Sequence, residues 1–380
     1  MDRVRRGVGP ACIAGVVLGA LVAGALVGGF PDLHVYRYGG SAILHHTGLY
    51  AADDPVTGYP FTYPPFAAVL LVPLAVLPGT AAAALWTAAS VAALVATIAL
   101  VLRAQGRPAP PAAIAVLAVG ALALEPVWQT LTFGQVNLLL MLALLVDLHH
   151  PQRRWSGLLV GVAAGIKLTP LVLVVLLVLV GERAAARRAG LTFAGTVLLG
   201  VLVLPGSAAS YWSEGLIDAR RVGPPALAHN QSAYGALTRL LGEPAPTWLW
   251  LVVAGPVAVA ILAVARRWWS EDRTAAICLA AVAMLVASPV SWSHHWVWAV
   301  PLTLVLWRHS RPAALAWAAV FVARPFTWLP WGQGREHDWR WFEQVPGNAY
   351  LLAALALTIV AARALNREHR CVVSPAGRCG

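Results

Sequence analysis

Long apolar stretches recur along almost the whole chain, and short polar segments separate them. A helix needs about twenty apolar residues to cross the hydrocarbon core of a bilayer, and fewer where it borders protein. The pattern therefore predicts an all-α, polytopic membrane protein with about twelve transmembrane helices, plus or minus two. We expect these helices at residues 8–30, 80–102, 111–127, 134–148, 156–168, 170–181, 190–205, 246–265, 274–290, 294–307, 312–328 and 347–364.

Two regions leave the number of crossings open. Residues 64–78 lie between proline-bearing turns, and we expect them to form a re-entrant or interfacial hairpin arm. If they span instead and residues 156–181 form one helix, the middle loops change sides. The basic start MDRVRR is typical of a signal peptide, but the apolar run that follows is rather long for one, so we expect a spanning helix there.

The composition excludes a water-soluble enzyme with a simple anchor. Of the 380 residues, 59% are hydrophobic and only 11% are charged, whereas a soluble domain carries roughly a quarter charged residues. Such a chain cannot cover a surface that faces water. We expect residues 1–364 to form a single integral membrane domain and residues 365–380 to be a polar, disordered cytoplasmic tail.

The positions of the positive charges along the chain are explained by its membrane topology. The formal charge is +11, yet the arginines form short clusters between apolar runs. Because no basic stripe with interleaved aromatic residues is found, we expect no nucleic-acid partner. Cytoplasmic loops are enriched in Lys and Arg, and this orientation places residues 31–63, 206–245 and 329–346 on the outer face. The clusters placed inside are Arg3/Arg5/Arg6, Arg103/Arg107, Arg153/Arg154, Arg183/Arg187/Arg188, Arg266/Arg267/Arg273, Arg308/Arg311 and Arg363/Arg367/Arg370.

The large outer loop after the first helix carries a carboxylate at the membrane boundary, Asp32. Glycosyl transfer to a hydroxyl needs a carboxylate that accepts the proton of the acceptor while the sugar–phosphate bond breaks. The alternative is that Asp32 caps the helix that follows it. Asp32 with Asp53 or Asp54 is also able to hold Mg or Mn, but this chemistry requires no metal, and we expect no cofactor.

Polar side chains also interrupt the apolar middle of the chain. Gln135 and Asn137 lie beside a spanning run, where amides are costly unless paired, so they bind sugar hydroxyls or form interhelical hydrogen bonds. Lys167 is the only lysine in the chain and lies between two apolar runs. An ionisable group in a membrane segment indicates a functional site, and an ammonium suits a lipid phosphate. The alternative is a lysine that snorkels at a helix end.

Two outer segments contribute histidines. The sequence HNQS contains His229, Asn230 and Gln231, which supply donors for sugar hydroxyls or cap the next helix. In SWSHHWVW, His294 and His295 lie at an outer helix end and point in different directions, so we do not expect both to bind one metal. We expect instead that one of the two histidines binds phosphate or orients the acid. The four cysteines show no spacing typical of a metal site or a disulfide framework.

These segments occur in a fixed order between residues 30 and 300: DLHVYRYG, PFTYPPFAAVLLVPL, GQVNLLLMLALLVDL, GIKLTPL, NQSAYGALTR and SWSHHWVW. Together they resemble glycosyltransferase family 87 of the GT-C superfamily. Its members are polyprenyl-phosphate-mannose-dependent alpha-1,2-mannosyltransferases that build phosphatidylinositol mannosides and lipoglycans in actinobacteria. The resemblance implies a multi-helix, GT-C-like membrane fold with a large outer loop after the first helix, and an inverting transfer. Residues 301–380 carry no motif of the family.

The resemblance also implies roles for individual residues. Asp32 matches the acid of the first outer loop and would be the general base. Lys167, His294 and His295, together with Arg37, would contact the donor phosphate. The sugar and acceptor cavity would be lined by Tyr63, Gln135, Asn137, His229, Asn230 and Gln231.

The implied function is transfer of mannose from polyprenyl-phosphate mannose to a membrane glycolipid or lipoglycan, on the extracytoplasmic face of the plasma membrane. No obligate protein partner is indicated. A transporter or flippase of a lipid-linked sugar is the first alternative, and it would not need Asp32 for any bond-making step. A structural or assembly subunit is the second, and it has little reason to place Lys167 in an apolar stretch.

Overall fold

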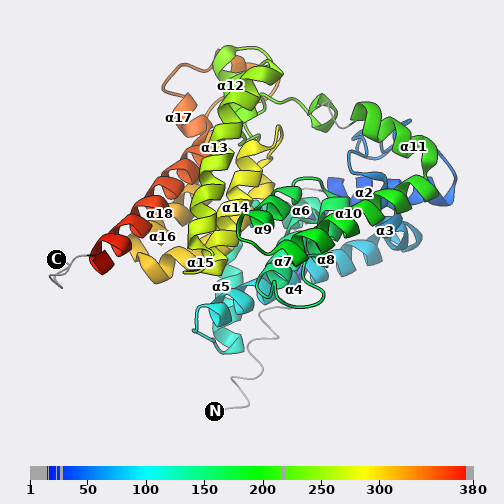
Figure 1. The fold of residues 1–380 in the computed structure, drawn as a ribbon. Helices are drawn as coiled ribbons and strands as arrows, with labels where there is room; N and C mark the ends of the chain where they lie inside the picture. Colours follow the sequence, from blue (N-terminus) through cyan, green and yellow to red (C-terminus); the bar gives the residue numbers. More distant parts are fainter. Residues whose placement is uncertain (1–14, 16, 23, 26–28, 216–218, 374–380) are drawn as a thin grey trace.

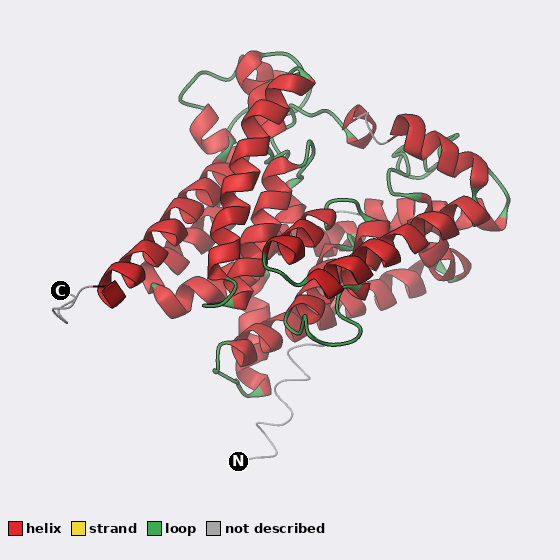
Figure 2. Cartoon of the chain, in the orientation of Figure 1, coloured by secondary structure: helices red, strands yellow, loops and turns green. Residues whose placement is uncertain are grey.

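The computed structural model describes residues 15–373 apart from residues 16, 23, 26–28 and 216–218, and this part of the chain is helical with no β-strand (Figure 2). The expectation of an all-α protein is confirmed. One isolated antiparallel bridge joins Asn230 to Trp292.

The helices are α2 (Pro31–Leu44), α3 (Pro65–Val76), α4 (Gly79–Ala104), α5 (Pro111–Ala121), α6 (Glu125–Phe133), α7 (Asn137–Leu148), α8 (Leu158–Ile166), α9 (Leu171–Leu179), α10 (Arg183–Val203), α11 (Pro205–Ser210), α12 (Ala233–Leu241), α13 (Thr247–Trp268), α14 (Arg273–Ala287), α15 (Ala299–His309), α16 (Arg311–Ala323), α17 (Gln344–Gly347) and α18 (Ala349–Val373). Short helical turns complete the list: η2 (Tyr211–Gly215), η3 (Ala219–Val222), η4 (Ser293–Trp298), η5 (Pro325–Trp328) and η6 (Arg335–Asp338).

The helices form two groups that pack side by side (Figure 1). In one group, α13 packs on α14 and α18, and α15 packs on α16. In the other, α2 packs on α3, α4 on α7 and α8 on α10. Contacts of α14 with α9 and of α15 with α4 join the groups, and the turn η4 lies against α6 and α7. Elements far apart in the sequence therefore meet around η4.

Among the described residues, three helices are long and apolar enough to cross a membrane: α4, α10 and α13. A fourth span is present if α5 and α6 count as one, although they are bent by 86°. The apolar helices α3, α7, α14 and the first part of α18 are shorter, with 10–17 residues each. The number of about twelve crossings thus stays a prediction.

Large parts of α10 and α13 are apolar and are not covered by protein. Only 22% and 28% of their most apolar windows are buried, and Leu202 and Val259 are 70% and 67% exposed. A soluble protein rarely leaves so much apolar helix surface open to water. These surfaces fit contact with lipid.

Several expected boundaries were wrong. The expected helix at 111–127 ends at Ala121, and α6 starts at Glu125 with Pro126 in its first turn, because proline cannot continue the preceding helix. The segment 294–307 begins with the 3-10 turn η4 before α15 starts at Ala299. Helix α18 continues to Val373, beyond the expected end at residue 364. Much of the expected first span, and residues 374–380, lie outside the described residues.

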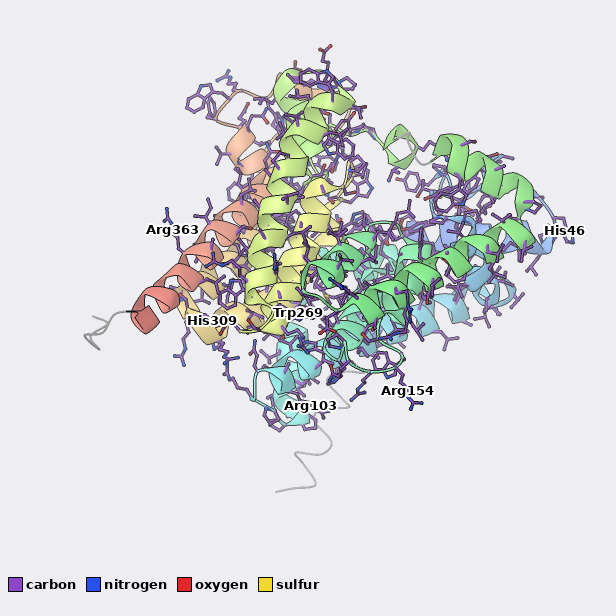
Figure 3. All side chains as sticks on the ribbon, in the orientation of Figure 1. His46, Arg103, Arg154, Trp269, His309 and Arg363 are labelled. Atoms are coloured by element: carbon purple, nitrogen blue, oxygen red, sulfur yellow. The ribbon has the colours of Figure 1, made fainter. Side chains whose placement is uncertain are left out.

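Several of the expected arginine clusters lie at one end of the helices. Figure 3 shows Arg103, Arg154 and His309 toward the lower side of the view, whereas α12 lies at the top (Figure 1). This separation agrees with the one-sided distribution of arginine that we expected from the sequence. Which membrane face each end meets stays a prediction.

Candidate active site

Helix α2 places Asp32 and Tyr36 on one face, because residues four apart are neighbours on a helix. Phe30, with φ 54°, turns the chain into α2, and Pro31 starts the helix. Asp32 lies in the first turn, and no side chain caps this N-terminus, so the capping alternative does not describe it. Asp32 is half-buried and Tyr36 is fully buried.

The turn between α6 and α7 brings an amide against this face. Gly134 has φ 70°, and a Cβ atom there would lie 2.7 Å from the Cβ of Leu33, so glycine permits both the turn and the close approach. Tyr36 donates a hydrogen bond to Oε1 of Gln135 at 2.8 Å. Gln135 Nε2 in turn donates to the hydroxyl of Tyr63 at 3.1 Å, and the two tyrosine hydroxyls are 3.0 Å apart. The expected residues Gln135 and Tyr63 therefore meet next to Asp32.

The break between α8 and α9 directs Lys167 into the same region. Lys167 ends α8 in an extended conformation, and α9 begins directly after Pro170. Its ammonium donates to Oδ1 of Asn137 at 3.4 Å and lies 2.9 Å from Nε2 of His295. It also lies 6.0 Å from the ring centroid of Tyr63. Residues from three other segments therefore surround the one lysine of the chain.

The turn η4 holds the two histidines in different environments. Asn137 Nδ2 donates to the carbonyl oxygen of His294 at 2.9 Å, and the hydroxyl of Thr130 donates to the same oxygen at 3.1 Å. This fixes the backbone, so that His295 faces Lys167. The Nε2 atom of His294 is buried without a hydrogen-bond partner among the described residues. The two rings cross at 83°, as expected of neighbours that point in different directions.

The carboxyl of Asp32 is tuned by its surroundings. Burial raises its pKa from 3.8 to about 7. The positive charge of Lys167 and a side-chain hydrogen bond with Gln135 lower the pKa by smaller amounts. A carboxylate with a pKa near neutral pH is well matched to accept a proton as a general base.

A small open cleft joins this polar cluster to apolar side chains. Asn137, Lys167, Ser291 and His295 line its polar part. Apolar side chains from α7 and α14 continue it: Leu140, Met141, Leu144, Met284 and Leu285. A lipid with a charged head and a hydrocarbon tail fits a cleft of this kind.

Comparison with known proteins identifies the family. The model of glycosyltransferase family 87 matches residues 61–289. The chain belongs to glycosyltransferase family 87. It is therefore a glycosyltransferase, and the match contains Gln135, Asn137 and Lys167, whereas Asp32, His294 and His295 lie outside the matched residues.

Curated relatives of this family 87 glycosyltransferase come from mycobacteria. A polyprenol-phosphate-mannose-dependent alpha-(1-2)-phosphatidylinositol pentamannoside mannosyltransferase from Mycobacterium tuberculosis (strain CDC 1551 / Oshkosh) is 38% identical over 86% of this chain and 80% of the relative. A polyprenol-phosphate-mannose-dependent alpha-(1-2)-phosphatidylinositol mannoside mannosyltransferase from Mycobacterium tuberculosis (strain ATCC 25618 / H37Rv) is 36% identical over 92% of this chain and 88% of the relative. No solved structure matches the chain.

Arg37 of the glycosyltransferase does not join the site. Its guanidinium donates to the carbonyl oxygens of Leu74 and Leu77 at 3.1 and 2.8 Å. These carbonyls lie at the C-terminal end of α3, where helix carbonyls lack partners within the helix. Arg37 thus holds α3 on α2, and we remove it from the donor-phosphate residues.

Asn230 and Gln231 also differ from their expected role. Both are fully buried. Asn230 donates to the carbonyl oxygens of Pro225 and Pro289 and accepts from the amide of Ser291. Gln231 donates to the carbonyl oxygens of Ala228 and Gly347, and its side-chain oxygen accepts a hydrogen bond from the amide of Tyr350. Their amides join backbone segments and leave no group for a sugar.

The sequence analysis missed several buried charged residues, among them Glu125, Glu336 and Arg239. Glu125 accepts hydrogen bonds from Ser293 and Tyr350. Glu336 and Arg239 are each 1% exposed and bind the backbone around residues 226–230. Glu125 carried a usable signal, because it is the only carboxylate between Asp54 and Asp147 and lies next to an apolar run.

The acidic residues of the first outer loop do not assemble around Asp32. Asp53 is exposed, and Asp54 accepts hydrogen bonds from the amide and hydroxyl of Thr57 at 2.9 and 2.7 Å. Within the described part of the chain, no group of three His, Cys, Asp or Glu side chains is arranged to hold a metal ion.

Proposed function

We propose that the glycosyltransferase moves mannose from a polyprenyl-phosphate donor to a hydroxyl of a phosphatidylinositol-mannoside-like glycolipid, with inversion at the anomeric carbon. The observation that carries the proposal is that the ammonium of Lys167, held beside Asn137 and His295, lies at the polar end of an apolar cleft and is close enough to Asp32 to lower the pKa of its carboxyl. The named activities of the mycobacterial relatives support the choice of donor and acceptor.

The residues divide the chemistry between them. Asp32 takes the proton of the acceptor hydroxyl while the acceptor oxygen forms a bond with the anomeric carbon. The bond between that carbon and the phosphate oxygen breaks, and polyprenyl phosphate leaves with the bonding electrons. Lys167 stabilises the negative charge that develops on the phosphate. Attack opposite to the leaving group converts a beta-linked donor into an alpha-linked product.

His295 and Asn137 act on Lys167 rather than on the phosphate. The ammonium has three N–H groups, of which one points at His295 and one at Asn137. The remaining N–H is available to the donor phosphate. A lysine held in this way loses little freedom when the donor binds.

The lipid parts of the substrates determine the location of the site. The apolar side of the cleft between α7 and α14 takes the first part of the polyprenyl chain. We place the active site on the extracytoplasmic face of the plasma membrane, because the arginine clusters between the apolar runs are expected on the cytoplasmic face. The expectation of about twelve crossings belongs to the same proposal.

A product analysis tests this function. Purified protein in liposomes is supplied with polyprenyl-phosphate mannose, labelled in the sugar, and with a phosphatidylinositol mannoside. We expect a labelled glycolipid that an alpha-mannosidase, but not a beta-mannosidase, converts back to free mannose. A beta-linked product contradicts inversion. Movement of the intact donor across the bilayer without a labelled product favours the flippase alternative.

A further inference from the structure

His229 lies at the end of a hydrogen-bond chain that begins at a buried carboxylate. Glu125 is 4% exposed, and the hydroxyl of Ser293 donates to its Oε1 atom at 2.7 Å. The hydroxyl of Tyr350 donates to Oε2 at 3.0 Å. The Nδ1 atom of His229 lies 3.1 Å from the same Ser293 oxygen. The three side chains Glu125, Ser293 and His229 thus form one chain.

When Glu125 is ionised, the number of protons fixes the direction of this chain. A serine hydroxyl has one proton, and the Ser293 hydroxyl has two acceptors within reach, Oε1 of Glu125 at 2.7 Å and Oε1 of Gln129 at 3.2 Å. The shorter bond goes to the carboxylate, and in either case Ser293 donates away from His229. Ser293 can then only accept from His229, so Nδ1 of His229 carries the proton. The other ring nitrogen, Nε2, keeps its lone pair and accepts a hydrogen bond. The burial of His229, which lowers its pKa to about 4, keeps this ring neutral.

The backbone on both sides of His229 is fixed. Glu336 accepts hydrogen bonds from the amides of Ala228 and Gly332 at 3.1 and 2.7 Å. Arg239 donates to the carbonyl oxygens of residues 226, 227 and 230. Ala228 and Gly332 are the direct neighbours of His229 and Trp331. The buried carboxylate therefore joins the two segments that carry these rings.

Two aromatic rings surround the imidazole. The ring centroids of Phe326 and Trp331 both lie 5.0 Å from that of His229. Phe326 is buried, whereas Trp331 is 40% exposed and His229 is half-buried. An open aromatic ring next to a hydrogen-bond acceptor is an amphipathic surface. A pyranose ring has this chemistry, since its C–H groups are apolar and its hydroxyls donate hydrogen bonds.

The turn η4 connects this surface to the active site. Ser293 is followed by His294, whose Nε2 atom is buried without a partner, and by His295, which contacts Lys167. A ligand at His229 therefore lies beside the residues that hold the donor. The loop with Phe326 and Trp331 follows the region matched by the family model, residues 61–289.

We propose that His229 and Trp331, with the buried Phe326 packed against the imidazole, form a subsite for a sugar ring of the glycolipid acceptor. A hydroxyl of this hexopyranoside donates to Nε2 of His229, and the ring lies on the exposed surface of Trp331. Glu125 is a positioning residue, because it sets the tautomer of His229 through Ser293. The assignment of the ligand as the acceptor rests on the proposed function.

Steady-state kinetics with each substrate varied in turn tests the subsite. His229→Phe keeps an aromatic ring and removes both nitrogens, so we expect the KM for the glycolipid to rise about tenfold, as for one lost hydrogen bond. The KM for polyprenyl-phosphate mannose should stay within about twofold of the wild type. Trp331→Leu should act in the same direction. The matched control is Trp328→Leu, which removes a tryptophan that is 67% exposed in the same loop.

The effect of Glu125→Gln separates positioning from a general loss of structure. The new amide donates to Ser293, which then donates to Nδ1 of His229 and moves the ring proton to Nε2. Nitrogen-15 chemical shifts of labelled histidine, assigned by comparison with His229→Phe, should show this change of tautomer together with a raised KM for the acceptor. An unchanged tautomer in Glu125→Gln overturns the positioning role.

Ligand binding without catalysis distinguishes the subsite from the proposed function. The probe is the methyl glycoside of an alpha-linked manno-disaccharide, observed by saturation-transfer NMR with the full-length protein in detergent. We expect a signal with wild type and Trp328→Leu that falls by more than half in His229→Phe and in Trp331→Leu. Equal signals in all four proteins, no signal with wild type, or a rise in the donor KM alone overturns the subsite. Binding that depends on His229 in a protein without mannosyl transfer keeps the subsite and contradicts the proposed function.

Discussion

The ammonium of Lys167 lies 2.9 Å from Nε2 of His295, although the two residues are 128 positions apart in the chain. An ammonium only donates hydrogen bonds, so His295 accepts this one and is a neutral imidazole. The pair therefore carries a single positive charge, which belongs to Lys167. His295 aims this charge, and the expectation that it contacts the donor phosphate changes to a role in holding the lysine.

Replacement of Lys167 tests the role of this charge. We expect Lys167→Met to lower kcat by about a hundredfold to a thousandfold, as for the loss of one group that stabilises charge in the transition state. Lys167→Arg keeps the charge but changes its shape, and should retain more activity than the methionine variant. Labelled mannose transfer at saturating donor and acceptor measures both effects. Full activity of Lys167→Met would rule out the proposed phosphate contact.

The raised pKa of Asp32 predicts the pH dependence of the reaction. A general base acts in its ionised form, so kcat/KM should fall as the pH falls through about 7, the pKa of Asp32. An ordinary aspartate would keep the rate constant down to about pH 4. The profile of kcat/KM between pH 5 and 9 shows which of these holds.

Coupling between Asp32 and Lys167 predicts a shift of that profile. The charge of Lys167 lowers the pKa of Asp32, so Lys167→Met should raise this pKa and move the fall in kcat/KM to higher pH. Because the variant has low residual activity, its profile is normalised to its own maximum before the two profiles are compared. A profile that stays in place or moves to lower pH contradicts the coupling.

Arg37 is expected to affect stability and not donor binding. Its loss leaves the carbonyl oxygens of Leu74 and Leu77 without this partner. Hydrogen bonds from a charged donor contribute about 1.5–3 kcal/mol, so Arg37→Met should lower the free energy of unfolding by about that amount. Thermal unfolding in detergent checks this, with the exposed Arg107→Met as control. A raised KM for the donor with unchanged stability would return Arg37 to the donor site.

Gln231 is likewise expected to be structural. Gln231→Leu leaves the carbonyl oxygens of Ala228 and Gly347 and the amide of Tyr350 without their buried partner. We expect a loss of at least about 3 kcal/mol in the free energy of unfolding, since three buried hydrogen bonds are unmade and each costs about 1–3 kcal/mol. Gln152→Leu, at an exposed position, is the control. Equal stability of the two variants would show that the network around Gln231 contributes little.

The sequence was sufficient to predict the members of the polar cluster. Lys167, Gln135 and Asn137 stand out because polar groups are costly inside apolar runs, and the structure brings them together with Asp32 and His295. The helix breaks that direct these side chains into the site were only partly visible in the sequence. Pro170 marks the break after Lys167, but the close approach of Gly134 to Leu33 on α2 becomes visible only in the fold.

The rest of the site depends on contacts between segments far apart in the sequence. HNQS is rich in donors, and the sequence does not show that the amides of Asn230 and Gln231 bind carbonyls near residues 289 and 347. Glu336 lies in a loop that reads as an ordinary polar connection, and its burial becomes visible only in the fold. The bend between α5 and α6 places Glu125 against η4, so neither its partners nor the tautomer of His229 follow from local sequence.

The central claim is that Asp32 removes the proton of the acceptor. The most direct test compares mannose transfer by wild type, Asp32→Asn and Asp53→Asn, the last being an exposed aspartate of the same loop. Each protein is purified, shown to be folded by its unfolding temperature, and supplied with labelled polyprenyl-phosphate mannose and a phosphatidylinositol mannoside. Our account predicts that Asp32→Asn loses transfer while Asp53→Asn keeps it. Transfer by folded Asp32→Asn at the wild-type rate would contradict the account.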